Sequence, residues 1–173
     1  VRYVVAPRLV PMPAFLRPIT ETPRYTLYRA DTTGYAQFAT VAGVSSVSSQ
    51  SALFFRNRVW FLSERPGAGQ FIRYDYPVAS GAPDRQGTPG CPGGGRVGDE
   101  RIRPARIEVR VECAEPTTLV LKMTYHPNWR VSVDGRETPT FMVSPSFIGL
   151  EVPAGGHEVR AEYRSPWYKI ALL

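Results

Sequence analysis

Five short segments between Arg106 and Tyr163 alternate apolar and polar residues, and this alternation constrains the fold more than any other feature. The apolar positions are Ile107, Val109 and Val111; Leu119, Leu121 and Met123; Trp129, Val131 and Val133; Ile148, Leu150 and Val152; and Val159, Ala161 and Tyr163. Side chains on a β-strand have this period of two. Turn signals such as Asp134-Gly135 and Pro145 separate the segments. We therefore predict an antiparallel β-sandwich, jelly-roll or immunoglobulin-like, whose strands bury one face and expose the other.

One segment of the N-terminal half follows a helical period instead. Its apolar stripe consists of Ala52, Phe55, Val59 and Leu62. These spacings of three and four residues place the stripe on one side of a helix. Ser48 or Ser49 is suitable as the N-cap. We predict one α-helix whose apolar stripe packs against the sheet.

The rest of the chain divides by composition. Residues 1–76 are predicted to be a mixed α+β part packed on the sandwich, with strands near residues 1–5, 25–29, 35–41 and 71–76. The prolines between Pro7 and Pro23 argue against regular structure through Thr22. Residues 77–104 are rich in Gly and Pro and are predicted to form a loop. Residues 105–165 are the sandwich strands, and residues 166–173 are predicted to begin a membrane-proximal segment.

The chain is basic, with a net charge of +6. Its Arg residues are scattered, however, and most of them alternate with Glu on the polar side of the predicted strands. This pattern is typical of a solvated surface of mixed charge. We predict no nucleic-acid partner.

Two features concern location. Cys113 is in register with Ile107 and Val111 and should face inward, and Cys91 lies in a Gly- and Pro-rich loop that can reach it. Cys91 and Cys113 are therefore candidates for a disulfide, which would imply an oxidising compartment, although two free thiols remain an alternative. Trp167, Tyr168 and Lys169 precede an apolar end, an order typical of chains that enter a bilayer. We expect them near the membrane, with the N-terminus at the same end.

The C-terminal half also resembles a known family. The segment Tyr125–Gly135 reads aromatic, His, Pro, Asn, Trp, Arg and then a strand ending in Asp-Gly; a second strand closes with Val-Pro-Ala-Gly, and a third runs into the apolar end. This order resembles the extracytoplasmic C-terminal region of YfhO-like bacterial multi-span membrane proteins, which are related to the GT-C class of glycosyltransferases. About 50 residues carry the strong resemblance, and the strands of the N-terminal half resemble the family more loosely.

The resemblance implies an extracytoplasmic domain of a cell-membrane protein, on the periplasmic or cell-surface side. Its partners would be the membrane helices of its own parent chain and a glycan or lipid-linked sugar. GT-C enzymes carry the catalytic acidic residue in loops near their membrane-embedded N-terminal part, so no catalytic residue can be transferred to this chain. We expect no catalysis by this chain alone, although the parent could be a GT-C-type glycosyltransferase, and we expect no cofactor and no metal site.

Candidate ligand-binding residues are aromatic or titratable. They are Trp60, Tyr74, Asp75, Tyr76 and His126. Aromatic rings can stack on sugars, but they also fill cores, and Trp129 is expected to belong to the core because it shares a face with Val131. Three functions remain open: a non-catalytic accessory domain that assists substrate binding or parent folding, a free-standing carbohydrate-binding module, and a purely structural or adhesive domain. Exposed, coplanar aromatic rings would favour the second.

Overall fold

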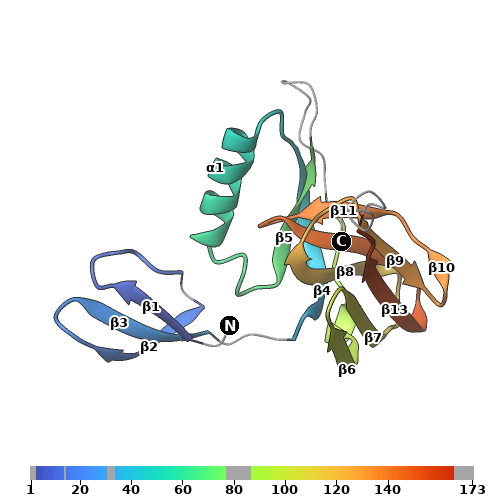
Figure 1. The fold of residues 1–173 in the computed structure, drawn as a ribbon, viewed down its shortest axis with the longest axis horizontal. Coiled ribbons are helices and arrows are strands. Elements are labelled where there is room, and N and C mark those ends of the chain that lie inside the picture. The colour runs from blue at the N-terminus through green and yellow to red at the C-terminus, as the bar shows by residue number, and fades with distance from the viewer. Residues whose placement is uncertain (1–2, 14, 31–33, 77–86, 166–173) are drawn as a thin grey trace, which may run out of the picture.

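The structure is a computed structural model, and it describes residues 3–13, 15–30, 34–76 and 87–165 (Figure 1). One α-helix, α1 (Gln50–Phe61), and a short 3-10 turn, Pro92–Gly94, accompany the strands in these ranges. The strands are β1 (Tyr3–Pro7), β2 (Leu16–Glu21), β3 (Tyr25–Ala30), β4 (Ala36–Ser46), β5 (Gln70–Asp75), β6 (Arg96–Arg103), β7 (Arg106–Cys113), β8 (Thr117–Thr124), β9 (Trp129–Val133), β10 (Arg136–Glu137), β11 (Thr140–Val143), β12 (Phe147–Val152) and β13 (Gly155–Tyr163). The prediction of a mainly β protein with one helix in its N-terminal half is confirmed.

The strands form three units. β1, β3 and β2 make an N-terminal sheet, with β3 in the middle. The order β10-β9-β13-β7-β6 makes a five-stranded antiparallel sheet. The order β11-β12-β8-β4-β5 closes into a small barrel through the pairing of β11 with β5. The prediction of a jelly-roll or immunoglobulin-like sandwich requires two open sheets. In the structure, the second of these sheets is a closed barrel.

The main core lies between the five-stranded sheet and the barrel. The sheet contributes Ile107, Val109, Val111, Val131, Val133, Val159 and Ala161, and the barrel contributes Ala36, Leu119, Leu121, Ile148, Leu150 and Val152. Trp129 is half-buried and packs against this core. The alternation read from the sequence is thus the alternation of the real strands, and its apolar side is buried as predicted.

The barrel strand β8 was predicted to expose one face to solvent, but it is buried on both faces. Leu119 and Leu121 face the main core, but Thr118 and Val120 between them are also fully buried. Val120 belongs to a second core cluster with Ala39, Phe71, Val143 and Trp60. β8 is buried on both faces because β4 and β12 flank it and hydrophobic clusters cover both of its sides.

The helix begins as predicted but turns a different face inward. The Ser49 side chain accepts a hydrogen bond of 3.2 Å from the Ala52 N–H, which caps the first turn. Trp60 is the buried residue of α1, whereas Phe55 and Val59 of the predicted stripe are exposed. Trp60 packs on Phe71 and belongs to the second core cluster, so one indole anchors the helix where the sequence suggested a stripe.

Three predicted segments differ in the structure. β6 occupies residues 96–103, which were predicted to be part of the loop; it is an edge strand with mostly exposed side chains, and such a strand has no apolar alternation to detect. β2 contains Pro18, which an edge strand with an irregular register tolerates. The strand predicted near residues 35–41 is longer, since β4 extends to Ser46; it pairs with β8 antiparallel and with β5 in parallel, and α1 connects β4 to β5.

The predicted disulfide is formed. Cys91 and Cys113 are bonded, with their Cα atoms 6.0 Å apart, and the bond fastens the segment before β6 to the end of β7. Gly95 lies against the bridge with a φ of 56°, and a Cβ atom at this position would lie 2.7 Å from the Cys91 Sγ. Only glycine fits there without strain, since both the conformation and the close approach exclude a side chain.

Candidate functional site

The aromatic ligand candidates Trp60 and Tyr74 lie in the interior. Trp60 is buried, and its indole N–H donates a hydrogen bond of 2.8 Å to the Gln70 carbonyl oxygen. Tyr74 is also buried, and its hydroxyl has no hydrogen-bond partner among the described residues. Burial raises the pKa of Tyr74 to about 12, although Arg56 and Arg65 oppose the shift. Neither ring presents a face to solvent on which a sugar could stack.

The other three candidates do not complete a site with them. Asp75 is half-buried and forms an ion pair of 3.6 Å with Arg73, and Tyr76 follows it at the end of β5. His126 is exposed in the connection between β8 and β9, where its Nδ1 accepts a hydrogen bond from the Asn128 N–H and its ring lies 5.5 Å from that of Tyr163. The first four candidates belong to α1 and the end of β5, whereas His126 contacts the five-stranded sheet.

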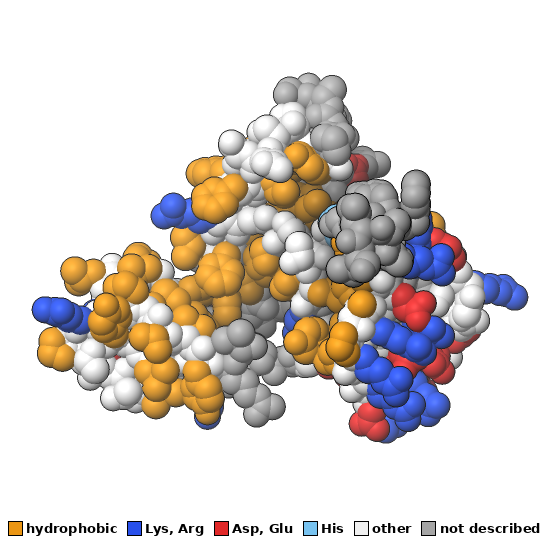
Figure 2. Space-filling model, viewed as in Figure 1, with side chains coloured by type: hydrophobic (Ala, Val, Ile, Leu, Met, Phe, Trp, Pro, Cys, Tyr) orange, Lys and Arg blue, Asp and Glu red, His pale blue; other side chains and the backbone are white. Residues whose placement is uncertain are grey.

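Charged side chains are concentrated on a different surface, the outer face of the five-stranded sheet. Figure 2 shows acidic and basic side chains intermingled over this part. Facing positions on neighbouring strands carry opposite charges, in the pairs Arg96–Glu112, Arg101–Glu108, Arg110–Glu158, Glu108–Arg160 and Arg130–Glu162. We call this set the charge lattice. The sequence had located it only as the polar side of the alternating strands.

Direct contacts hold parts of the charge lattice in place. Arg106 is paired with Glu108 and lies 3.6 Å from Glu162, which is also paired with Arg160. The hydrogen bond from Arg106 lowers the pKa of Glu108, and the hydrogen bond from Arg160 lowers that of Glu162. Both carboxylates therefore stay ionised over the physiological range, and the face presents fixed hydrogen-bond donors and acceptors at its surface.

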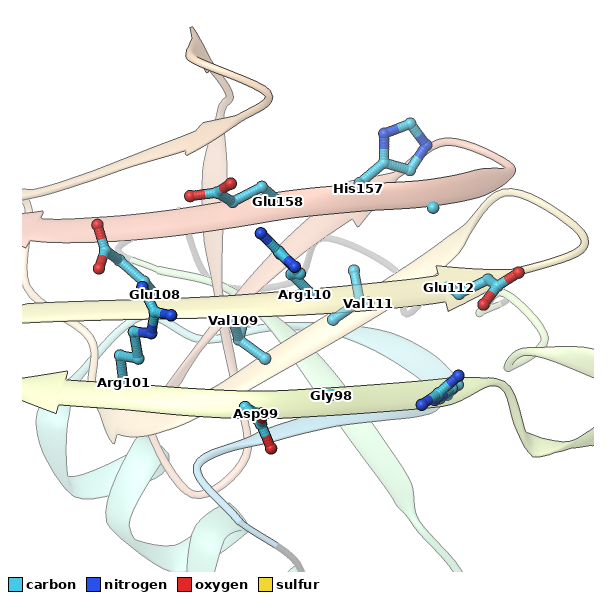
Figure 3. Close-up of a pocket in the computed structure, with 12 residues that line it drawn as sticks. Gly98, Asp99, Arg101, Glu108, Val109, Arg110, Val111, Glu112, His157 and Glu158 are labelled. Atoms are coloured by element: carbon cyan, nitrogen blue, oxygen red, sulfur yellow. The ribbon is translucent and has the colours of Figure 1, made fainter.

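A depression of about 560 Å³ lies on this face between β6, β7 and β13 (Figure 3). Asp99, Arg101, Arg110 and Glu158 are among the side chains that line it. The pairing of β6 with β7 is irregular between Val97 and Glu100, which places a bulge at the edge of the depression. A second depression, of about 520 Å³, lies on the same sheet over β9, β10 and β13. Charged side chains of both signs line both depressions.

His157 and Asp134 form a hydrogen-bonded pair beside this face. The Asp134-Gly135 turn connects β9 and β10 with positive φ at both residues, as expected for a hairpin. Asp134 Oδ2 lies 2.6 Å from His157 Nδ1, and His157 Nε2 lies 3.1 Å from the Ala154 carbonyl oxygen. Because both ring nitrogens face acceptors, the protonated imidazolium is favoured. The bond to Asp134 raises the pKa of His157, and the same bond lowers that of Asp134.

This pair predicts a dependence of stability on pH. The raised pKa of His157 means that its contribution is complete below its ordinary pKa of 6.5 and is lost as the pH rises through the raised value. The lowered pKa of Asp134 means that its contribution is complete above 3.8 and is lost as the pH falls further. Urea unfolding should therefore show a stability that declines as the pH rises from 6.5 through the raised pKa of His157. Asp134→Asn, which also tolerates positive φ, should flatten this decline. An unchanged decline in that variant would exclude the pair as its source.

Within the part of the chain that the structure describes, no helix has the length and apolar character required to cross a bilayer. No group of three or more His, Cys, Asp or Glu residues suited to a metal ion occurs among the described residues. Trp167, Tyr168 and Lys169, which were predicted to lie near the membrane, are outside the described ranges, so their placement stays a prediction.

Comparison with known proteins identifies the C-terminal part. No curated protein and no solved structure matches the chain. Residues 97–173 match the model of the family described as bacterial membrane protein YfhO. The match begins within β6 and includes every later strand of the five-stranded sheet, together with β8, β11 and β12 of the barrel. The resemblance read from the sequence is therefore confirmed for residues 97–173, which match this family of bacterial membrane proteins.

Proposed function

We propose that the chain is a non-catalytic extracytoplasmic domain of a multi-span bacterial membrane protein of the YfhO type. The observation that carries the proposal is the Cys91–Cys113 disulfide within a chain that matches a membrane protein family. Structural disulfides persist in oxidising compartments and are rare in the cytosol. The extracytoplasmic side of the membrane is where both properties are expected together.

Labelling in intact cells tests the sidedness. Arg136 lies on the exposed two-residue strand β10, so Arg136→Cys in the full-length parent should leave the fold intact. A membrane-impermeant maleimide should label this thiol without permeabilisation, while Cys91 and Cys113 stay bridged and unreactive. A cysteine introduced into a cytoplasmic loop of the parent serves as the control. Labelling of Arg136→Cys only after permeabilisation would overturn the proposal.

Within this role, the domain would assist substrate binding or parent folding. The parent would be a glycosyltransferase-like protein, and the glycan or lipid-linked sugar would lie on the charge lattice, where the two depressions offer hydrogen-bonding side chains. The free-standing carbohydrate-binding module is the weaker alternative, because Trp60 and Tyr74, two of the rings expected to stack on a sugar, are buried. A purely structural role would leave the charge lattice unoccupied when soluble glycans are titrated into the protein and nuclear magnetic resonance signals are followed.

A further inference from the structure

One side of α1 carries exposed apolar side chains that no described part of the chain covers. Phe54, Phe55, Val59 and Leu62 are 70%, 65%, 55% and 48% exposed, respectively. We call these four residues the α1 apolar face. At 3.6 residues per turn they lie within roughly 140° of one another around the helix axis. Trp60 lies on the opposite side and holds the helix to the barrel, so the α1 apolar face is turned to the outside.

The same half of the chain carries most of the net positive charge. Residues 1–76 contain nine Arg and four Asp or Glu, whereas residues 77–173 contain 12 Lys or Arg and 11 Asp or Glu. Five of the six net positive charges therefore belong to the half that includes α1. The helix itself contains Arg56 and Arg58 and no acidic residue, and Arg58 falls between Phe54 and Leu62 on the exposed side.

The exposed apolar surface continues beyond the helix onto the N-terminal sheet. The Phe61 ring contacts Phe15 edge to face, with centroids 5.6 Å apart. Exposed apolar side chains of the N-terminal segment are Tyr3, Val5, Leu9, Val10, Ile19 and Tyr25. Figure 2 shows apolar side chains over α1 and the N-terminal sheet, and the charged side chains mainly over the five-stranded sheet at the other end. A contiguous apolar surface of this kind marks a site of interaction with a partner or a membrane.

We propose that the α1 apolar face docks the domain onto a bilayer of anionic phospholipid. The Phe rings would enter the boundary between headgroups and acyl chains, and Arg58 would stay at the level of the lipid phosphates. Exposed Phe and aliphatic side chains with an Arg among them can bury apolar area at the interface while the guanidinium stays near the phosphates. This inference rests on the proposed function, since a domain of a membrane protein lies close to a bilayer.

Charge decides between the bilayer and a second copy of the chain. Two copies meeting through the α1 apolar face would bring two positively charged halves together, and like charges across an interface disfavour association. An anionic lipid surface attracts the same charges, and each basic residue near the surface strengthens binding. The aromatic residues and the Arg excess are thus explained by one partner.

Vesicle flotation with the 173-residue chain tests the proposal. The chain should float with vesicles of equal parts phosphatidylglycerol and phosphatidylcholine and remain unbound with phosphatidylcholine alone. Phe54→Ser/Phe55→Ser should weaken the binding by about tenfold or more, because affinity follows the apolar area that is inserted. Arg58→Glu should weaken it as well and should reduce its sensitivity to salt. The matched control is Val97→Ser/Ile102→Ser, which replaces two exposed apolar residues of β6 and should bind like the unchanged chain.

Three outcomes would overturn the inference. The chain could fail to bind anionic vesicles, or Phe54→Ser/Phe55→Ser could bind as tightly as the β6 control. Alternatively, sedimentation could reveal a dimer that the same two substitutions abolish, which would make a second copy the occupant. Each variant is first checked by urea unfolding, so that loss of binding is not confused with loss of the fold. The flotation result does not depend on membrane sidedness, so its failure is distinguishable from a failure of the labelling experiment.

Discussion

Trp60→Ala is expected to lower the free energy of unfolding by about 4 kcal/mol, since truncating a buried aromatic residue removes its transfer energy and leaves a cavity. Trp60 is 6% exposed, its ring lies 5.4 Å from that of Phe71, and its N–H bonds the Gln70 carbonyl oxygen. The substitution would empty the second core cluster at the point where α1 meets the barrel. Urea unfolding followed by circular dichroism measures the effect.

Two companion variants make this result specific. Trp60→Phe keeps a ring but loses the hydrogen bond, so it should cost about 1–2 kcal/mol. Phe54→Ala changes an aromatic residue of the same helix that is 70% exposed, and it should change stability by no more than about 0.5 kcal/mol. Equal effects of Trp60→Ala and Phe54→Ala would show that the indole does not anchor α1.

Cys91→Ser/Cys113→Ser is expected to lower the free energy of unfolding by about 3 kcal/mol, the loop-closure entropy of a disulfide that spans 22 residues. The bond fastens the chain that leads into β6 to the last residue of β7. β6 is an edge strand with mostly exposed side chains. Its pairing with β7 therefore depends on backbone hydrogen bonds and on this bridge more than on packing.

Reduction of the disulfide provides an independent measurement of its contribution to the free energy of unfolding. The unchanged protein in a strong thiol reductant should unfold at the denaturant concentration at which the double Ser variant unfolds, and the variant should not respond to the reductant. Hydrogen exchange should show that β6 is the strand that loses most protection. If reduction exposed both thiols and left the unfolding midpoint unchanged, the bridge would have no stabilising role.

The same sequence rules explain both the correct and the wrong predictions. The alternation of Val109, Val131 and Val159 identifies strands with one wet face, and all three residues lie in the main core. Thr118, Leu119, Val120 and Leu121 form a continuous buried run, because β8 is a central barrel strand with hydrophobic clusters on both sides. Such a run indicates a strand buried on both faces. The prediction considered only Leu119, Leu121 and Met123 as an apolar face, so it missed the burial of the residues between them.

The local sequence by itself determined the strand alternation, a serine cap at residue 48 or 49, the Asp134-Gly135 turn and the inward direction of Cys113, because each depends on neighbours a few residues away in the chain. Only the tertiary structure decided which side of α1 is buried, that β5 closes a barrel, and that Arg and Glu from separate strands meet in the charge lattice. These outcomes depend on pairing between distant segments. A stripe such as Phe55 and Val59 has the same helical periodicity whether it faces a core or the surface, and only the assembled fold determines which.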